Sequence, residues 1–148
     1  MIAQIPFWQR KRLSEMAPDE WESLCDGCGK CCLNKLEDAD TGEVYHTDLV
    51  CRFMDTDNCR CTVYPERLKK VPGCTVLTPD TVKDYYWLPY TCAYRTLAED
   101  RPLADWHPLR SGRPDSVHEA GVSIRHKVIS EDLVAEEDWE EHIIHWVL

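Results

Sequence analysis

The chain has 148 residues, which is enough for one domain with its own hydrophobic core. Its 27 Asp and Glu residues outnumber its 17 Lys and Arg residues, and the net charge of −10 argues against a nucleic acid held through its phosphates. No stretch approaches the roughly 18 apolar residues of a membrane span, and the start of the chain lacks the apolar core of a signal peptide. We therefore expect a cytoplasmic protein with neither a membrane nor a nucleic-acid partner.

One or two short helices are expected over residues 6–24, ahead of the cysteines. Pro18 suits the first position of a helix, and the two acidic residues after it interact favourably with the helix dipole. Two local basic groups, Arg10-Lys11-Arg12 and Arg67–Lys70, interrupt the acidic composition. We interpret each of them as a solvated helix face.

All nine cysteines lie between residues 25 and 92. We interpret the chain as a single α+β domain, residues 1–148, with a cysteine-rich metal-binding part over 25–92 and a Cys-free part over 93–148. Four thiols stand in one run, Cys25-Asp-Gly-Cys28-Gly-Lys-Cys31-Cys32. The candidate metal ligands are Cys25, Cys28, Cys31, Cys32, Cys51, Cys59, Cys61, Cys74 and Cys92, with Cys59 and Cys92 outside the principal set.

The spacing of the first thiols is typical of metal binding in a reducing compartment. A Cys-x-x-Cys turn lets two thiolates reach one ion, and Gly27 and Gly29 relieve the backbone strain of such a turn. The run repeats this spacing, as ferredoxin-type iron–sulfur sites do, but an adjacent cysteine follows and no proline does. Thiolates suit zinc and iron alike, so the predicted cofactor is zinc or iron, with an iron–sulfur cluster as one form. Plain core cysteines and metal-free thiol chemistry at Cys28-Gly-Lys-Cys31 are the alternative interpretations.

Nine thiolates exceed the four of one tetrahedral site, so we expect two neighbouring centres or one polynuclear centre. In extended backbone, Cys31 and Cys32 would point to opposite faces and serve different centres. By the same rule, Cys59 and Cys61 would share a face and suit one centre.

Turn residues Asp38 to Gly42 separate two segments of strand character and predict a β-hairpin over residues 33–50, whose outgoing strand leads to Cys51. The acidic turn lacks the ligand pattern of a calcium loop. The other elements expected are, in chain order, a short helix from Pro65 through Lys70, a helix near Tyr85–Trp87, a helix over Thr91–Glu99 with Cys92 in its first turn, a loop over 101–121, a strand over 122–129 and an amphipathic C-terminal helix over 136–147.

The six histidines are further candidates for metal ligands or proton carriers. If the protein has an active centre, His107, in an expected irregular loop, and His126, on an expected strand, are the first to test. Of the two interpretations, we favour structural roles for both. His142 and His145 stand three residues apart on the expected C-terminal helix and could share an ion, although the glutamate of a zinc-protease helix is missing.

Several motifs resemble a known family. The run at 25–32, with Cys51, Cys61-Thr-Val-Tyr-Pro-Glu-Arg67 and Cys74, is similar to the CxxCxxCC domain, which is proposed to chelate zinc or iron. The chain departs from the usual Arg-Pro of that domain, because Leu68 follows Arg67. Further motifs resemble the bacterial YcgN family of cysteine-cluster proteins along nearly the whole chain: Pro6-Phe-Trp8, Trp21-Glu-Ser-Leu-Cys-Asp-Gly-Cys28, Leu88-Pro-Tyr-Thr-Cys-Ala-Tyr-Arg95, Trp106-His-Pro-Leu109 and Ser123-Ile-Arg-His126.

The resemblance implies a bacterial, cytoplasmic, metal-binding protein of uncharacterised role. Related domains occur in an enzyme of the flagellin lysine methylase type, which makes iron–sulfur chemistry a reasonable expectation. Three hypotheses follow: a metal-binding protein of unknown biological role, an iron–sulfur redox protein or enzyme with His107 or His126 near the cluster, and a zinc-stabilised module whose acidic tail contacts a basic protein. The sequence identifies no catalytic residue, substrate or protein partner.

Overall fold

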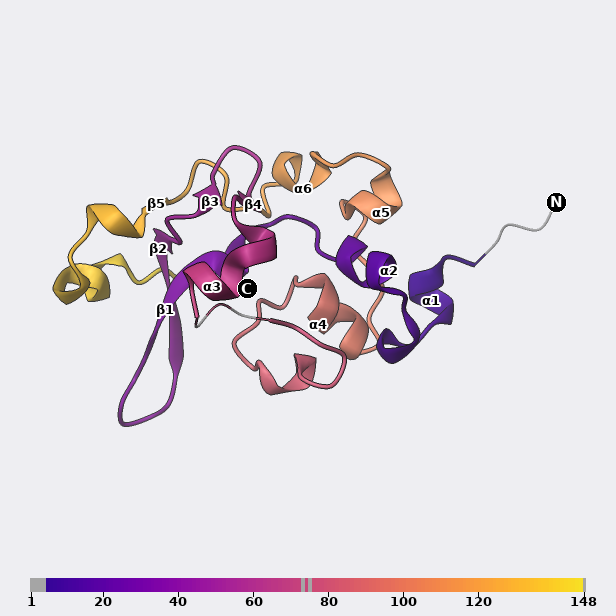
Figure 1. The fold of residues 1–148 in the computed structure, drawn as a ribbon, viewed down its shortest axis with the longest axis horizontal. Coiled ribbons are helices and arrows are strands. Elements are labelled where there is room, and N and C mark those ends of the chain that lie inside the picture. The colour runs from indigo at the N-terminus through magenta and orange to yellow at the C-terminus, as the bar shows by residue number, and fades with distance from the viewer. Residues whose placement is uncertain (1–4, 73, 75, 148) are drawn as a thin grey trace. The chain divides into compact units, whose positions relative to one another are not determined.

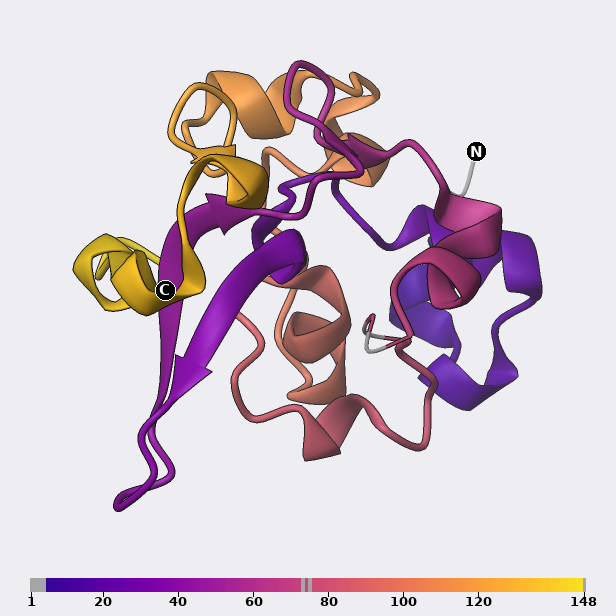
Figure 2. The ribbon, with the colours of Figure 1, turned by 60° about the vertical axis from the view of Figure 1, so that its left-hand side comes forward.

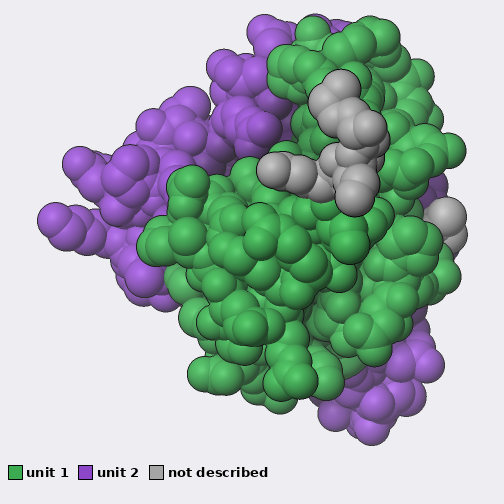
Figure 3. Space-filling model, turned by 90° about the vertical axis from the view of Figure 1, so that its right-hand side faces the viewer, with its two compact units in different colours: residues 1–26, 76–120 green, residues 27–75, 121–148 purple. Residues whose placement is uncertain are grey.

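The computed structural model describes residues 5–72, 74 and 76–147 (Figure 1). The chain forms two compact units, coloured separately in Figure 3, and each is built from two separate stretches of sequence. Unit 1 comprises Met1–Asp26 and Val76–Ala120, and unit 2 comprises Gly27–Thr75 and Gly121–Leu148. None of the helices in the described part of the chain has the length and apolar character that crossing a bilayer requires.

Unit 1 is built from short helices. They are α1 (Phe7–Arg10), the 3-10 helix η1 (Leu13–Glu15), α2 (Pro18–Ser23), the 3-10 helix η4 (Val82–Asp84), α4 (Ala93–Ala98), α5 (Pro108–Ser111) and α6 (Ser116–Glu119). Pro18 occupies the first turn of α2, as predicted, and the Glu20 side chain accepts a hydrogen bond from the Ala17 amide at 2.8 Å. The expected helices ahead of the cysteines are therefore confirmed, whereas α5 and α6 occupy a stretch expected to be a loop.

The core of unit 1 joins the two stretches of sequence that build it. Leu24, Val82, Leu88 and Tyr94 are buried together and carry a shell of partly buried aromatic side chains. The Tyr94 hydroxyl donates to the Trp21 carbonyl at 2.8 Å, and the two rings lie 4.7 Å apart. This burial of apolar surface stabilises the unit without help from regular long helices.

Among the described residues, all the strands lie in unit 2, where they form two small sheets. Its elements are η2 (Lys30–Cys32), β1 (Leu33–Glu37), β2 (Val44–Val50), β3 (Met54–Asp55), β4 (Arg60–Cys61), η3 (Tyr64–Glu66), α3 (Arg67–Lys70), β5 (Ile129–Ser130), η5 (Glu131–Leu133) and η6 (Glu136–His142). The antiparallel pair β1–β2 is the predicted hairpin, and Figure 2 shows its connecting turn at the tip. β5 pairs in parallel with β2 to complete a three-stranded sheet, and β3 pairs with β4 in the second sheet. Short helices with a mixed sheet confirm the α+β class.

The predicted helix near Tyr85–Trp87 is wrong, because the helical turn comes earlier, at Val82–Asp84. The Tyr85 and Trp87 rings meet edge to face, with centroids 5.3 Å apart. Side chains two positions apart do not face each other on an α-helix, so this contact requires the irregular backbone seen here. The next helix is confirmed as α4, with Cys92 as its N-cap residue rather than in its first turn.

The predicted strand over 122–129 is also wrong except at its end, where β5 begins at Ile129. The Ile124 amide donates to the Cys28 carbonyl at 2.9 Å, and the Lys127 amide donates to the Ile124 carbonyl in a turn. His126 has a φ of 64°, a left-handed conformation that cannot continue a strand. This stretch is therefore shaped by its contact with the first cysteine motif.

The predicted amphipathic C-terminal helix over 136–147 is wrong as well. A 3-10 helix, η6, ends at His142, and Ile143 is extended. Ile143 forms an isolated antiparallel bridge with Thr47, and the Ile144 amide donates to the His46 carbonyl at 2.9 Å. The tail thus pairs with β2, and its apolar residues Ile144 and Val147 pack on the core of unit 2 through that pairing.

Candidate metal centre

The nine cysteines are divided between the two units, and all nine are free thiols. Cys25 and Cys92 belong to unit 1. Unit 2 contains the other seven: Cys28, Cys31, Cys32, Cys51, Cys59, Cys61 and Cys74. Unit 2 is therefore the part of the structure in which a polythiolate centre can be built.

The first cysteine motif depends on two glycines in left-handed conformations. Gly27 has a φ of 81° and Gly29 a φ of 76°, which confirms the predicted role of these residues in the turn. A Cβ atom on Gly29 would lie 2.8 Å from Cγ1 of Ile124, whose side chain is completely buried. The Cys32 amide then donates to the Gly29 carbonyl at 3.0 Å as η2 begins. Backbone conformation and close packing both require glycine at position 29.

Strand pairing brings distant thiols to the same end of the hairpin. The Cys51 amide donates to the Cys32 carbonyl at 3.0 Å, directly beyond the pair Leu33 and Val50. The Met54 amide donates to the Cys51 carbonyl, and Met54 pairs with Cys61 between β3 and β4. A chain of backbone hydrogen bonds therefore links three cysteine positions that are well separated in sequence.

Five thiols interact electrostatically, and we call them the thiol cluster: Cys31, Cys32, Cys51, Cys61 and Cys74. The pKa of Cys32 is raised by its hydrogen bond with the Cys31 side chain, then by burial and by the charges of other cluster members. Burial also raises the pKa of Cys51 and of Cys74, and the neighbouring thiols raise both further. Each thiolate opposes ionisation of the next, so a bound cation would relieve repulsion that these side chains otherwise share. This donor set fits a thiophilic ion.

The predicted opposite orientation of Cys31 and Cys32 is wrong, because these residues lie in the 3-10 helix η2 and their side chains are hydrogen-bonded. The predicted shared face of Cys59 and Cys61 is wrong too. Cys59 has a φ of 57° and packs in the apolar core with Ile124, whereas Cys61 neighbours the thiols of the cluster. The left-handed residue breaks the alternation on which that prediction rested.

Burial differs among the thiols. Cys31 is exposed, the other four members of the cluster are half-buried, and Cys28 and Cys59 are buried. In the chain from 5 to 72, at 74 and from 76 to 147, no three His, Cys, Asp or Glu side chains are gathered in a ready-made metal geometry. The cluster is thus a partly open set of neighbouring donors with an exposed member through which an ion can enter.

Two lysines in or near the cysteine motif, Lys35 and Lys30, were not predicted to belong to the site. The Lys35 ammonium donates to the carbonyls of Cys31 at 3.1 Å and of Leu33 at 2.8 Å. Burial lowers its pKa, while the thiols of Cys31, Cys32 and Cys74 act in the opposite direction. Lys30, inside the cysteine motif, is only 4% exposed. The half-buried cation of Lys35, which interacts with three thiols, offsets part of the negative charge that thiolate ligands would bring to this site.

His46 lies close enough to both lysines for their charges to affect it. It pairs with Lys35 across the hairpin, and its Nε2 atom is buried without a hydrogen-bond partner. Burial, followed by the charges of Lys35 and Lys30, lowers the pKa of His46 to about 4. The imidazole is therefore neutral at physiological pH.

A test of His46 follows from this lowered pKa. Between pH 6.5 and about 4, His46 is protonated in the unfolded chain but stays neutral in the folded chain. The free energy of unfolding therefore decreases as pH falls through this window, by about 3 kcal/mol in total. Replacing it (His46→Gln) is expected to flatten this part of the pH profile in urea unfolding, whereas the exposed His145→Gln is not. Equal profiles for His46→Gln and the unaltered protein would contradict the assignment.

The histidines singled out from sequence have other roles. His107 is 1% exposed and caps α5, accepting from the Leu109 amide at its Nδ1, while its Nε2 donates to the Leu24 carbonyl at 2.8 Å. It is a fully bonded structural residue of unit 1. His126 is exposed on its left-handed turn. His142 bonds Asp48 at 2.9 Å and lies at the end of η6, with His145 beyond it, so the expected helical pairing of these two is wrong.

The amino-acid sequence of this chain is similar to those of several known proteins. The CxxCxxCC family model, described as "Putative zinc- or iron-chelating domain", matches residues 24–93. A UPF0260 protein of Marinobacter nauticus is 80% identical over 148 residues, covering 100% of both chains. That of Cellvibrio japonicus is 60% identical over 147 residues, which is 99% of this chain and 100% of the relative. That of Vibrio parahaemolyticus is 52% identical over 141 residues, which is 95% of this chain and 94% of the relative. No solved structure matches. The similarity extends well beyond the cysteine-rich segment.

Proposed function

Because this chain belongs to the UPF0260 family, and the resemblance to YcgN proteins agrees with that membership, we propose that unit 2 is a thiolate metal-binding module for zinc or iron. The observation that supports it best is the thiol cluster, whose five members come from separate parts of the sequence and lie close enough that ionisation of one raises the pKa of another. Scattered core cysteines have no reason to converge in this way.

The members of the thiol cluster are the ligands that we propose first. Cys28 and Cys59 of the same unit are second in order of preference. Lys35 would offset the charge of the thiolates, because its ammonium group bonds the Cys31 carbonyl and interacts with three thiols of the cluster, and Lys30 is buried within the same motif. When bound, zinc supplies a rigid cross-link, and an iron–sulfur cluster supplies the same cross-link together with electron transfer. Cys25 and Cys92 of unit 1 remain candidate ligands, and the experiment below also tests Cys92.

The experiment is a metal analysis of protein purified without oxygen, with acid-labile sulfide and the visible absorption spectrum measured on the same sample. We expect bound metal in the unaltered protein and loss of at least half of it in the double variant Cys51→Ser, Cys74→Ser, because each of these substitutions removes a soft donor from the cluster. The matched control is Cys92→Ser, whose side chain packs on the core of unit 1 and should leave the metal content unchanged.

The outcomes separate the two metals and can refute the proposal. Iron with sulfide and a brown colour identifies an iron–sulfur centre, and a colourless protein with zinc identifies a structural site. Full metal content in the double variant, or no metal in the unaltered protein, would contradict the assignment of the cluster. Loss of metal in Cys92→Ser would extend the ligand set to unit 1.

A further inference from the structure

Unit 1 contains a pocket that the proposed metal chemistry does not use. Its volume is about 820 Å³, within the range of small-molecule sites in proteins. Three segments of unit 1 line it: residues 8–16, residues 79–83 and residues 97–103. None of the cysteines lines it. The pocket therefore requires an explanation of its own.

The charges around this pocket differ from those of the whole molecule. Five of the 17 Lys and Arg residues line it, against two carboxylates, although the chain carries a net charge of −10. The five are Arg10, Lys11, Arg12, Lys83 and Arg101, and the two carboxylates are Asp80 and Asp100. The basic group at 10–12, interpreted above as a solvated helix face, is thus part of a concave surface.

Two of these five cations are already paired. Lys11 bonds Glu20 at 2.7 Å, and Arg101 bonds Glu99 at 2.6 Å and stacks on the Tyr90 ring. In contrast, the structure gives neither Arg12 nor Lys83 an ion pair with any described residue. Positive charge that is not neutralised within the protein is available to a bound anion.

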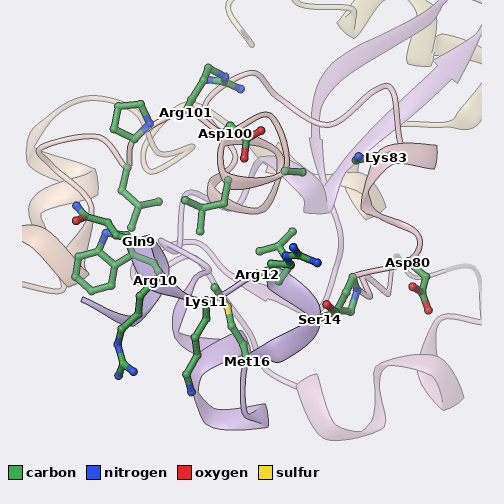
Figure 4. Close-up of a pocket in the computed structure, with 17 residues that line it drawn as sticks. Gln9, Arg10, Lys11, Arg12, Ser14, Met16, Asp80, Lys83, Asp100 and Arg101 are labelled. Atoms are coloured by element: carbon green, nitrogen blue, oxygen red, sulfur yellow. The ribbon is translucent and has the colours of Figure 1, made fainter. Parts of the chain in front are cut away.

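The directions of the side chains distinguish the remaining cations. Figure 4 shows Arg12 extending toward the middle of the lining residues, near Ser14, while Arg10 and Lys11 extend together away from the others. Apolar side chains complete the lining, among them Trp8, Leu13 and Leu97. The pocket therefore offers two unpaired cations, a hydroxyl, an aromatic ring and an apolar wall.

We propose that this pocket binds a small phosphorylated organic molecule. Its phosphate group would meet Arg12 and Lys83, since guanidinium and ammonium groups are the usual side-chain donors to phosphate. Its organic part would pack against Trp8 and Leu97, and its hydroxyl or amino groups would donate to Asp80 and Asp100. A nucleoside monophosphate and a sugar phosphate have all three parts. The proposal concerns unit 1 and stands or falls independently of the metal.

The test is isothermal titration calorimetry of the full chain, as purified with its metal, using AMP and ribose 5-phosphate as probes. We expect saturable binding of at least one of them, and binding of the matching neutral compound, adenosine or ribose, to be at least about tenfold weaker because the charged hydrogen bonds are lost. Arg12→Gln and Lys83→Gln are each expected to weaken binding by about tenfold for the same reason. Both side chains are exposed, so these substitutions should leave the fold intact.

The matched control is Arg10→Gln, which changes the net charge equally two positions away but removes a side chain that extends away from Arg12 and Ser14. It is expected to change the dissociation constant by less than twofold. No saturable binding of either phosphate probe overturns the proposal, and so does an equal loss of affinity in Arg10→Gln and Arg12→Gln. Equally tight binding of inorganic phosphate alone would overturn the part assigned to the organic group.

Discussion

Removing the metal from the reduced protein with a chelator is expected to unfold unit 2 while unit 1 keeps its structure. A structural metal in a small thiolate site contributes on the order of 10 kcal/mol, comparable to the whole stability of a typical domain. We expect unit 2 to depend on that contribution, because its buried apolar cluster carries a smaller shell of partly buried hydrophobic residues than the core of unit 1 does. The cluster comprises Leu33, Val50, Cys59 and Ile124. The third strand of the larger sheet of unit 2, β5, is two residues long. Without a cross-link such a small core offers little to oppose chain entropy.

Hydrogen exchange with residue resolution is the measurement that separates the two units. Amides of β1 and β2 should lose protection after chelation, whereas amides of α4, held by the Leu24, Val82, Leu88 and Tyr94 core, should retain it. Adding zinc or iron back under reducing conditions is the control and should restore protection in the hairpin. If the chelated protein keeps both its melting temperature and the protection of β1 and β2, the metal has no structural role.

Replacing glycine by alanine at position 29 is expected to destabilise the protein by about 3 kcal/mol. Part of this is the left-handed backbone at φ 76°, which costs an L-residue roughly 1 to 2 kcal/mol. The rest comes from overlap of the new Cβ with Cγ1 and Cδ1 of Ile124, at 2.8 and 2.9 Å, in a core with no room to move. Urea unfolding monitored by circular dichroism gives the free energy directly.

The chain contains a matched control in the same unit. Gly121 has a φ of 73°, almost that of Gly29, but a Cβ there meets nothing within 4 Å. Gly121→Ala therefore measures the backbone cost alone and is expected to destabilise by about 1 kcal/mol. In a background of Ile124→Ala, the cost of Gly29→Ala should fall to about the same value, because the overlapping atoms are gone. Equal effects at the two glycines would show that packing against Ile124 is unimportant.

Local features were predictable from the sequence, and long-range pairings were not. The hairpin over β1 and β2 followed from a turn between two strand-like segments, and the glycine turn at Gly27 and Gly29 followed from the spacing of the cysteines. The parallel pairing of Leu49 with Ile129 joins residues far apart in sequence through strands too short to show a pattern. The tail has helical spacing, but the bridge from Ile143 to Thr47 outweighs this local preference.

The candidate site divides in the same way. The nine thiols were recognisable from their spacing, but the grouping of five of them depends on how the hairpin ends meet β3 and β4. His46 was one of six candidate histidines, but neither it nor Lys30 could be singled out, because burial of a polar side chain is decided by tertiary packing and not by its neighbours in sequence. For Lys30 one signal existed, since it stands between two cysteines of the motif.

The alternation of the two units along the chain has a consequence for biosynthesis. Because unit 2 is split between Gly27–Thr75 and Gly121–Leu148, the ribosome completes every cysteine of that unit before it makes Ile124, which packs beside Gly29, or β5, which closes the sheet. At typical elongation rates of about 5 to 20 residues per second, the thiols remain on an unfinished nascent chain for several seconds. Protection from oxidation during that interval has to come from the cellular surroundings, and the final 28 residues of unit 2 set the earliest moment at which its fold can close.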